Sequence, residues 1–204
     1  HSAMPASRAH RLCPKAVFVP PDFTRYRTIS AQVRKMFRRY TELIEPLSLD
    51  EAYLDVTQNN LSIPTATAIA RQIREEIRTE IGLTASAGVA PNKFLAKIAS
   101  DWRKPDGLFV IQPHEVEGFL NALPVNKLPG VGKATATSLE RLNIASVADL
   151  RTKPLEELTI RFGKFGRRLH ELSRGIDDNP VRAHRPRKSL SVETTFDDDK
   201  VLAD

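Results

Sequence analysis

The chain has 204 residues, of which 41% are hydrophobic and 27% charged, the composition of an ordinary folded protein. Its net charge is +6, which suits a partner with phosphate groups but does not by itself identify one. It contains no apolar run near the roughly 18 residues that a membrane span requires, and its start resembles no secretory signal. Cys13 is the single cysteine, so no internal disulfide can form, and we predict a cytoplasmic protein.

The positive charge is concentrated in one segment. Residues 161–188 hold nine Lys or Arg and three acids, so 9 − 3 gives the same +6 as the whole chain. The remainder of the chain is therefore close to neutral. A concentrated basic segment is a sign of nucleic-acid binding, although such segments are also common on solvated surfaces.

The first half of the chain predicts helices alternating with short strands. The spacing of apolar residues predicts helices at 2–11 and 26–40, and a third that begins at Pro64 and ends before Gly82. The alternation predicts an α+β layer, with the helices on one face of a mixed sheet. The other expected elements are two short strands within 43–57, the second at 52–56, a strand at 84–90, a helix at 92–102 and a strand at 108–111.

After Gln112-Pro113 the sequence predicts a small all-helical domain. Residues 180–186 have the composition of a linker, and residues 189–196 begin a new strand-like run. Short helices separated by Pro and Gly are expected near 115–122, 133–142, 146–151, 155–162 and 164–174.

The adjacent acids Asp50 and Glu51 are the first candidate site. They lie in a tight connection between two expected strands, within Ser48-Leu49-Asp50-Glu51-Ala52-Tyr53-Leu54-Asp55. Carboxylates are hard oxygen ligands that suit Mg²⁺, and two such ions can activate an attacking oxygen and clamp phosphates. The alternative interpretation, a solvated pair of acids in a turn, is the commoner one for a bare Asp-Glu pair.

Lys104 is the second candidate. It stands in the loop Lys104-Pro105-Asp106-Gly107, just after the helix expected over residues 92–102. A lysine there would offer a point charge to a triphosphate. The alternative is that Lys93, Lys97 and Lys104 only keep this helix and its end solvated.

The segment Leu128-Pro129-Gly130-Val131-Gly132-Lys133 is the third candidate, followed by an expected helix. Two glycines around one apolar residue allow a tight turn whose N–H groups, with the helix dipole, can hold a phosphate. With a short helix before it, this is a helix-hairpin-helix pattern that would grip the DNA backbone, unless the turn serves only for packing. Residues 161–168 could form a second such hairpin or a basic solvated face.

Together these segments resemble the Y-family of lesion-bypass DNA polymerases. The Ser48–Asp55 octet, the Asn92–Gly107 block and the Leu128–Lys133 hairpin occur in the family's order and approximate spacing, and the likeness covers nearly the whole chain. The resemblance implies error-prone, template-directed transfer of a nucleotide from a dNTP to a primer 3′-OH, by a two-metal mechanism.

The resemblance also implies the fold, an incomplete ferredoxin-like palm followed by an all-helical thumb with a helix-hairpin-helix. In these terms the chain divides into the end of the fingers (1–19), the palm without its first strand (20–112), the thumb (113–180), a linker (181–190) and the start of the little finger (191–204).

The site residues that the resemblance implies follow by position. Asp50 and Glu51 would be two of three catalytic carboxylates and ligands of Mg²⁺, with two ions per active site in the intact enzyme. Ser48 would support this site, and Lys104 would bind the triphosphate of the dNTP. Contacts to primer-template DNA would come from Gly130, Val131, Gly132, Lys133, Lys164 and Arg167.

Some parts that the resemblance implies are missing from these 204 residues. They are the palm strand with the third metal-binding aspartate, most of the fingers, most of the little finger, and the tail that binds the sliding clamp. We therefore expect a fragment that is inactive alone. Because the missing strand is central, we expect dimer pairing, a swapped segment or a separate N-terminal piece to fill its place.

Two other functions compete with this one. In a non-catalytic DNA-binding module, the hairpins and the basic segment would bind DNA, and Asp50 and Glu51 would have only a structural role. A palm-like nucleotidyl cyclase would use carboxylates and Mg²⁺ without a DNA template. The Leu128–Lys133 hairpin argues against the cyclase, and the context of Asp50 and Glu51 argues against the module.

Overall fold

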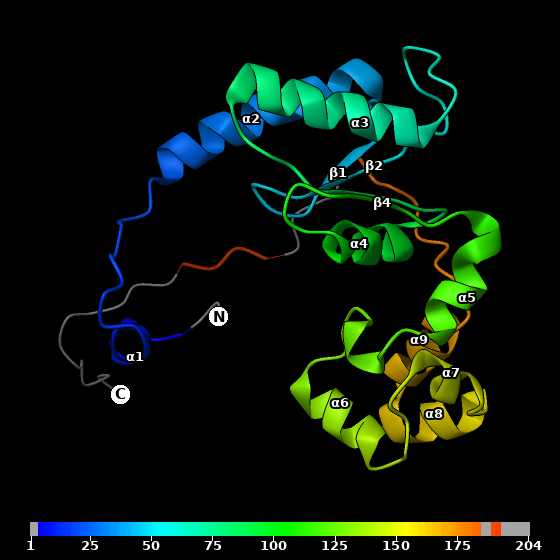
Figure 1. Ribbon diagram of the computed structural model, residues 1–204. Coiled ribbons are helices and arrows are strands. Elements are labelled where there is room, and N and C mark those ends of the chain that lie inside the picture. The colour runs from blue at the N-terminus through cyan, green and yellow to red at the C-terminus, as the bar shows by residue number, and fades with distance from the viewer. Residues whose placement is uncertain (1–3, 185–188, 193–204) are drawn as a thin grey trace.

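The computed structural model describes residues 4–184 and 189–192 (Figure 1). Two lobes follow one another along the chain: a mixed lobe of residues 23–111, with helices and strands, and a helical lobe of residues 113–172. The first helix, α1 (Ala6–Leu12), lies apart from both lobes (Figure 1). Among the described residues, no helix is both long and apolar enough to cross a membrane.

The long helices of the mixed lobe are α2 (Phe23–Tyr40) and α3 (Ala66–Glu76), which ends in a π-helical turn (Ile77–Ile81). The expected helix start at Pro64 is wrong by two residues, because the Thr65 side chain accepts a hydrogen bond from the Ala68 N–H and caps the helix. Gly82, with a φ of 74°, ends the last turn as predicted. The apolar faces of the two helices enclose a small core that includes Met36, Ile69, Ile73 and Ile77.

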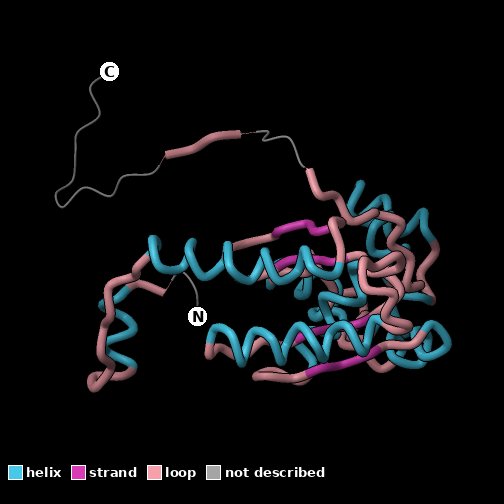
Figure 2. The backbone as a smooth tube through the Cα atoms, turned by 90° about the horizontal axis from the view of Figure 1, so that it is seen from above, coloured by secondary structure: helices cyan, strands magenta, loops and turns pink. Residues whose placement is uncertain are grey.

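The strands form two separate pairs. Strands β1 (Ile44–Pro46) and β2 (Ala52–Leu54) are antiparallel, whereas β3 (Ala87–Val89) and β4 (Leu108–Val110) are parallel. No backbone ladder joins β2 to β3 among the described residues, so the strands form two small sheets instead of one continuous mixed sheet. Such a gap is what the loss of a central strand predicts. Seen from above, the two magenta pairs lie apart (Figure 2).

Helix α4 (Lys93–Trp102) lies on the opposite side of the strands from α2 and α3 (Figure 1). Ala85 packs into the core of α2 and α3, whereas Ala90 packs into the core that contains α4, because alternate residues of an extended segment face opposite sides. A side chain at Gly88 would lie 2.2 Å from the Ala96 carbonyl, so glycine lets α4 lie directly on β3. The expectation of helices on one face is therefore wrong: they cover both.

The helical lobe forms from short helices around fully buried leucines and other aliphatic residues. Three predicted helices begin at the expected residues and end within two residues of the expected ends, namely 133–142, 155–162 and 164–174. The elements of this lobe are a 3₁₀ turn (Pro113–Glu115), α5 (Val116–Asn121), a second 3₁₀ turn (Val125–Lys127), α6 (Lys133–Glu140), α7 (Val147–Arg151), α8 (Leu155–Phe162) and α9 (Lys164–Leu172).

The two lobes are joined at the first turn of α4. The Asp177 carboxylate accepts a hydrogen bond from the Phe94 N–H at 3.1 Å and pairs with Arg168 of α9 at 2.8 Å. The Asn92 side chain donates to the Gly175 carbonyl at 2.8 Å. The strand-like run expected at 189–196 has no regular structure over residues 189–192, and residues 193–196 lie outside the described part of the chain.

Candidate functional site

Asp50 and Glu51 lie in the tight turn between β1 and β2. The Ser48 hydroxyl accepts from the N–H groups of Asp50 and Glu51 at 3.3 and 3.1 Å, and donates to Asp50 Oδ1 at 2.6 Å. Arg34 of α2 donates to the Ser48 carbonyl at 3.0 Å and ties the turn to the helix. Ser48 therefore shapes the turn and orients one carboxylate, which is a supporting position beside the acids.

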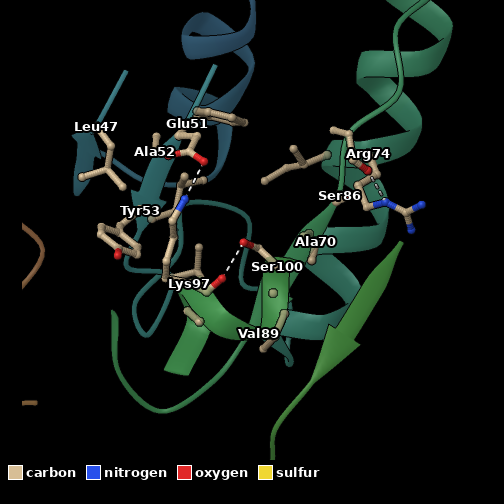
Figure 3. Close-up of a pocket in the computed structure, with 18 of the residues that line it drawn as sticks. Leu47, Glu51, Ala52, Tyr53, Ala70, Arg74, Ser86, Val89, Lys97 and Ser100 are labelled. Carbon is tan, nitrogen blue, oxygen red and sulfur yellow. Dashed lines mark hydrogen bonds and ion pairs between the residues drawn. The ribbon is translucent and has the colours of Figure 1, made fainter. Parts of the chain in front are cut away.

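Two lysines approach these acids from α4 and the loop after it. Lys97 Nζ lies 2.5 Å from Glu51 Oε1, and Figure 3 shows its side chain rising from α4 toward Glu51. Lys104 pairs with Asp101 at 2.6 Å. The hydrogen bond to Asp101 raises the pKa of Lys104, and the charges of Glu51 and Asp50 act in the same direction. Lys97 thus contacts the acidic turn directly, whereas Lys104 pairs with Asp101 in the loop after α4.

The donor chemistry of Asp50 and Glu51 fits Mg²⁺ in kind but not in number. Their carboxylate oxygens are hard ligands, and the turn presents two of them side by side. In the described part of the chain, however, no group of three or more acidic, His or Cys side chains is placed to hold a metal ion. The Lys97 ammonium also occupies one oxygen of Glu51. By their chemistry these two acids could supply only part of a metal site.

A cleft of about 1470 Å³ separates the two strand pairs and runs up to the acidic turn. Its walls include Ala52 and Leu54 of β2 and Gly88 of β3, with Ile73 of α3 and Lys97 of α4. Figure 3 shows this space between Ala52 and Glu51 on one side and Ala70 and Ser86 on the other. Asp50 and Glu51 thus lie at the edge of an open cleft between the two strand pairs.

The backbone on both sides of this cleft is open for pairing. Glu51 accepts from the Leu47 N–H and the Asp55 N–H donates to the Leu43 carbonyl, so these groups of β2 face β1. By antiparallel alternation, the N–H and C=O groups of Ala52 and Leu54 face the cleft. On β3, Ala87 and Val89 bond toward β4, so the backbone groups of Gly88 face the cleft from the other side.

The first hairpin, Leu128–Lys133, leads into α6. Gly130 has a φ of 86°, and a side chain there would lie 2.9 Å from the Phe165 ring, so both conformation and space require glycine. Gly132 is the N-cap of α6, and no side chain caps the helix. The first N–H groups of α6 therefore point outward beside the exposed Lys133, an arrangement that can hold a phosphate. Val131 is buried and anchors the turn.

The second hairpin, residues 161–168, has the same construction. Gly163, with a φ of 57°, separates α8 from α9, and α9 also begins without a side-chain cap. Lys164 and Arg167 are exposed on its first turns. Because Phe165 packs against Gly130, the two hairpins lie beside each other. The structure thus brings together the basic residues that were predicted to bind DNA.

Sequence reasoning missed several side chains of this site. Lys97 was considered only as a solvated lysine, yet it pairs with Glu51. Arg74, 30 residues before Lys104, contacts the loop that carries Lys104. Asp177 joins the lobes from a segment treated as the end of a helical domain. For Lys97, the i+4 spacing from Lys93 on one helix face was the available signal.

Comparison with known proteins adds independent findings. Residues 1–101 match the model of the impB/mucB/samB family, and residues 126–177 match a model described as DNA polymerase-iota, thumb domain. DNA polymerase IV of Xanthomonas campestris pv. campestris (strain 8004) is 60% identical over 201 residues, 98% of this chain and 56% of that protein. DNA polymerase IV of Neisseria meningitidis serogroup C is 57% identical, over 99% of this chain and 57% of that protein.

Solved structures show the same likeness. The crystal structure of DinB from Sulfolobus solfataricus superposes with a TM-score of 0.82 at 37% identity, over 89% of this chain and 54% of that one. An insertion ternary complex of Dbh DNA polymerase gives a TM-score of 0.80 at 37% identity, over 88% of this chain and 53% of that one. The chain thus spans somewhat more than half the length of these relatives.

Proposed function

Because this chain belongs to the Y-family of DNA polymerases, we propose that it is part of an error-prone translesion DNA polymerase. The intact enzyme transfers a nucleotide from a dNTP to a primer 3′-OH as a template directs. The observation that carries this proposal is the placement of Asp50 and Glu51, held in one turn by Ser48, paired with Lys97, and lining one cleft with Lys104. Such a cluster of oxygen donors and ammonium groups suits phosphoryl transfer.

In this proposal Asp50 and Glu51 hold Mg²⁺, with two ions per site in the intact enzyme. The ions would supply charge for the triphosphate and an activated oxygen. Ser48 fixes the orientation of Asp50 through its 2.6 Å hydrogen bond. Lys104 binds the triphosphate of the dNTP, because its ammonium lies in the field of both acids yet its side chain is 51% exposed.

The two hairpins would bind the backbone of primer-template DNA. Gly130, Val131 and Gly132 shape the turn whose N–H groups meet a phosphate, and Lys133 adds a charge. Lys164 and Arg167 do the same at the start of α9. Because these contacts read phosphates and not bases, binding should be independent of sequence and steeply dependent on salt.

An extended strand would fill the cleft in the working enzyme. The inward-facing backbone groups of Ala52, Leu54 and Gly88 need partners, and the cleft volume of about 1470 Å³ leaves room for one strand. The source of that strand is the remainder of a longer protein, since the curated relatives extend well beyond the matched segment. A second copy or a swapped segment is the competing source.

Hydrogen exchange and sedimentation would test the strand. In the 204-residue chain the amides of Ala52, Leu54 and Gly88 should exchange fast, and the chain should sediment as a monomer. In a chimera that carries residues 1–204 in place of the matching segment of the Xanthomonas enzyme, the same amides should be protected. If the 204-residue chain instead sediments as a dimer and these amides exchange slowly, the strand that fills the cleft comes from a second copy.

The same chimera tests the polymerase itself. We expect primer extension by the chimera, loss of extension on Asp50→Asn, and unchanged extension on Glu42→Gln, an exposed acid on the same hairpin. The 204-residue chain alone should incorporate no nucleotide, since two acids hold a two-metal geometry poorly. Template-dependent incorporation by the chain alone, or full activity of the Asp50→Asn chimera, would contradict the proposal.

The principal alternative remains a non-catalytic DNA-binding module built on the two hairpins. It predicts no metal binding at the acidic turn. Broadening of NMR signals near Asp50 by Mn²⁺, abolished by Asp50→Ala, would exclude this alternative.

We place the enzyme in the cytoplasm, where chromosomal DNA is available in bacteria, and expect contact with a sliding clamp only through segments outside these 204 residues.

A further inference from the structure

Arg74 of α3 is hydrogen-bonded to the loop of residues 103–107, which carries Lys104, although no sequence motif connects the two. Its Nε donates to the Ala85 carbonyl at 2.8 Å, and its NH2 donates to the carbonyl and carboxylate of Asp106 at 2.6 and 2.8 Å. One side chain from α3 therefore bridges the segment before β3 and the loop before β4. Only 17% of it is exposed, and Figure 3 shows it beside Ser86.

The loop itself has little freedom once Arg74 is in place. Asp106 has a φ of 49°, a conformation that few residues other than glycine adopt without support. A side chain at Gly107 would lie 1.8 Å from the Arg103 carbonyl, so the loop turns back on the end of α4. The Gly107 N–H donates to Ser86 Oγ at 3.2 Å, and its carbonyl accepts from the Ala87 N–H at 2.8 Å. Arg74 holds the loop at Asp106, the residue that these contacts leave free.

Arg78, one turn later, provides a comparison within the same structure. It reaches only the second oxygen of the Asp106 carboxylate and is 50% exposed. It donates to neither backbone carbonyl that Arg74 holds. The guanidinium of Arg74 is a planar fork that can join several acceptors at once, which a single ammonium cannot do.

We propose that Arg74 is a positioning residue that holds the 103–107 loop so that Lys104 faces the cleft that Asp50 and Glu51 also line. The proposal rests on the proposed role of Lys104 as a ligand of the triphosphate. Arg74 itself touches no substrate: it acts through Asp106, two residues from Lys104, and through the edge of β3. Its loss would leave the loop folded back but loosely held, with Lys104 oriented only by its pair with Asp101.

The test uses the 204-residue chain and two readouts: amide exchange at residues 103–107, and affinity for inorganic tripolyphosphate followed by NMR. Arg74→Gln should speed exchange in the loop and weaken tripolyphosphate binding by about fivefold, the effect of one lost hydrogen bond. Arg78→Gln should leave both readouts near wild type. Arg74→Lys, which keeps the charge but not the fork, should show the same changes at smaller size even if Arg74→Gln folds poorly.

Three results would overturn the proposal, and they are distinguishable. If Lys104→Ala leaves tripolyphosphate binding unchanged, the proposed role of Lys104 is wrong and the positioning role falls with it. If Lys104→Ala weakens binding but both Arg74 variants match wild type in loop exchange and affinity, the role of Lys104 stands and the positioning role alone is wrong. An equal loss in the Arg78 variant would show that general charge, and not the bridge, is responsible.

Discussion

The helical lobe and the mixed lobe differ in how completely each buries its own residues. In the helical lobe Leu123, Leu139, Ile144, Leu158 and Leu169 are all 0% exposed. In the mixed lobe, by contrast, β2, β3 and β4 are half-buried along their whole length, and a cleft of about 1470 Å³ separates the two strand pairs. The core of the helical lobe is continuous with Phe94, Leu95, Ile98 and Ile111 around α4, whereas the mixed lobe is open between its strand pairs.

The difference follows from how helices and strands satisfy their backbones. A helix pairs its own N–H and C=O groups, so a run of short helices can close around a core with no help from distant chain. A strand pairs with a neighbour, and an edge left without one keeps unpaired groups. The helices should therefore need no added chain to pair their backbone groups, whereas the strands of the mixed lobe await a partner.

A cavity in the helical core should have the largest effect on stability. Leu139→Ala removes a fully buried side chain and should lower the free energy of unfolding by about 3 kcal/mol. Ile160→Ala, on the neighbouring α8 but 85% exposed, is the control and should change it by less than about 0.5 kcal/mol. Urea denaturation measures both. Equal effects would show that Leu139 is not packed as its burial indicates.

The junction of the lobes should give the next largest effect. Asp177→Asn removes the charge that joins Arg168 of the helical lobe to the first turn of α4, and should cost about 2 kcal/mol at pH 7. Asp178→Asn, an exposed neighbour, should cost almost nothing.

The effect of Asp177 should also depend on pH. Burial raises its pKa, but hydrogen bonds from Asn179 and Arg168, with the Arg168 charge, outweigh burial and hold the pKa below its ordinary value. The carboxylate thus stabilises the folded chain above the unfolded pKa of about 3.9, and this contribution is lost as pH falls through the lower folded value. Urea denaturation at pH 7 and pH 3 should show a smaller wild-type advantage over Asp177→Asn in acid. A difference that is constant with pH would contradict this.

Substitutions at Gly130 and Gly132 test which of the two glycines the conformation of the first hairpin requires. Gly130→Ala should lower the free energy of unfolding by about 1–2 kcal/mol, because φ is 86° and the Phe165 ring lies 2.9 Å from the new methyl group. Gly132→Ala meets nothing within 4 Å and has a φ of −81°, so its stability should be close to wild type. Thermal unfolding followed by circular dichroism would compare them.

The smallest expected effect is on DNA binding. Lys164→Ala should weaken binding to primer-template DNA equally for all sequences and reduce the slope of log affinity against log salt by about 1. Lys35→Ala, exposed on α2 far from both hairpins in sequence, is the matched control and should leave the slope unchanged. Fluorescence anisotropy at several salt concentrations gives both values. A sequence-dependent loss would contradict a backbone grip.

The helices were predictable because their signals are local. The apolar spacing in 26–40 indicated α2, and Pro154 and Gly163 bracket α8 as expected for a helix start and end. The start of α3 was misplaced because two adjacent residues, Pro64 and Thr65, both suit a helix start, and the capping hydrogen bond decided between them. The strands lie where the sequence predicts them, including the hairpin of β1 and β2. The parallel pairing of β3 with β4 could not be read from the sequence, since it joins segments that are far apart in the chain.

The site divides in the same way. The sequence by itself determined the local conformation of the segments that we propose to carry the chemistry: the acids in the Ser48–Asp55 octet, Lys104 in its tight loop, and the two glycine hairpins. Only the tertiary structure decided what surrounds them. It placed Lys97 on Glu51, Arg74 on the Lys104 loop, and an open cleft beside β2, because these contacts join segments that no local pattern connects.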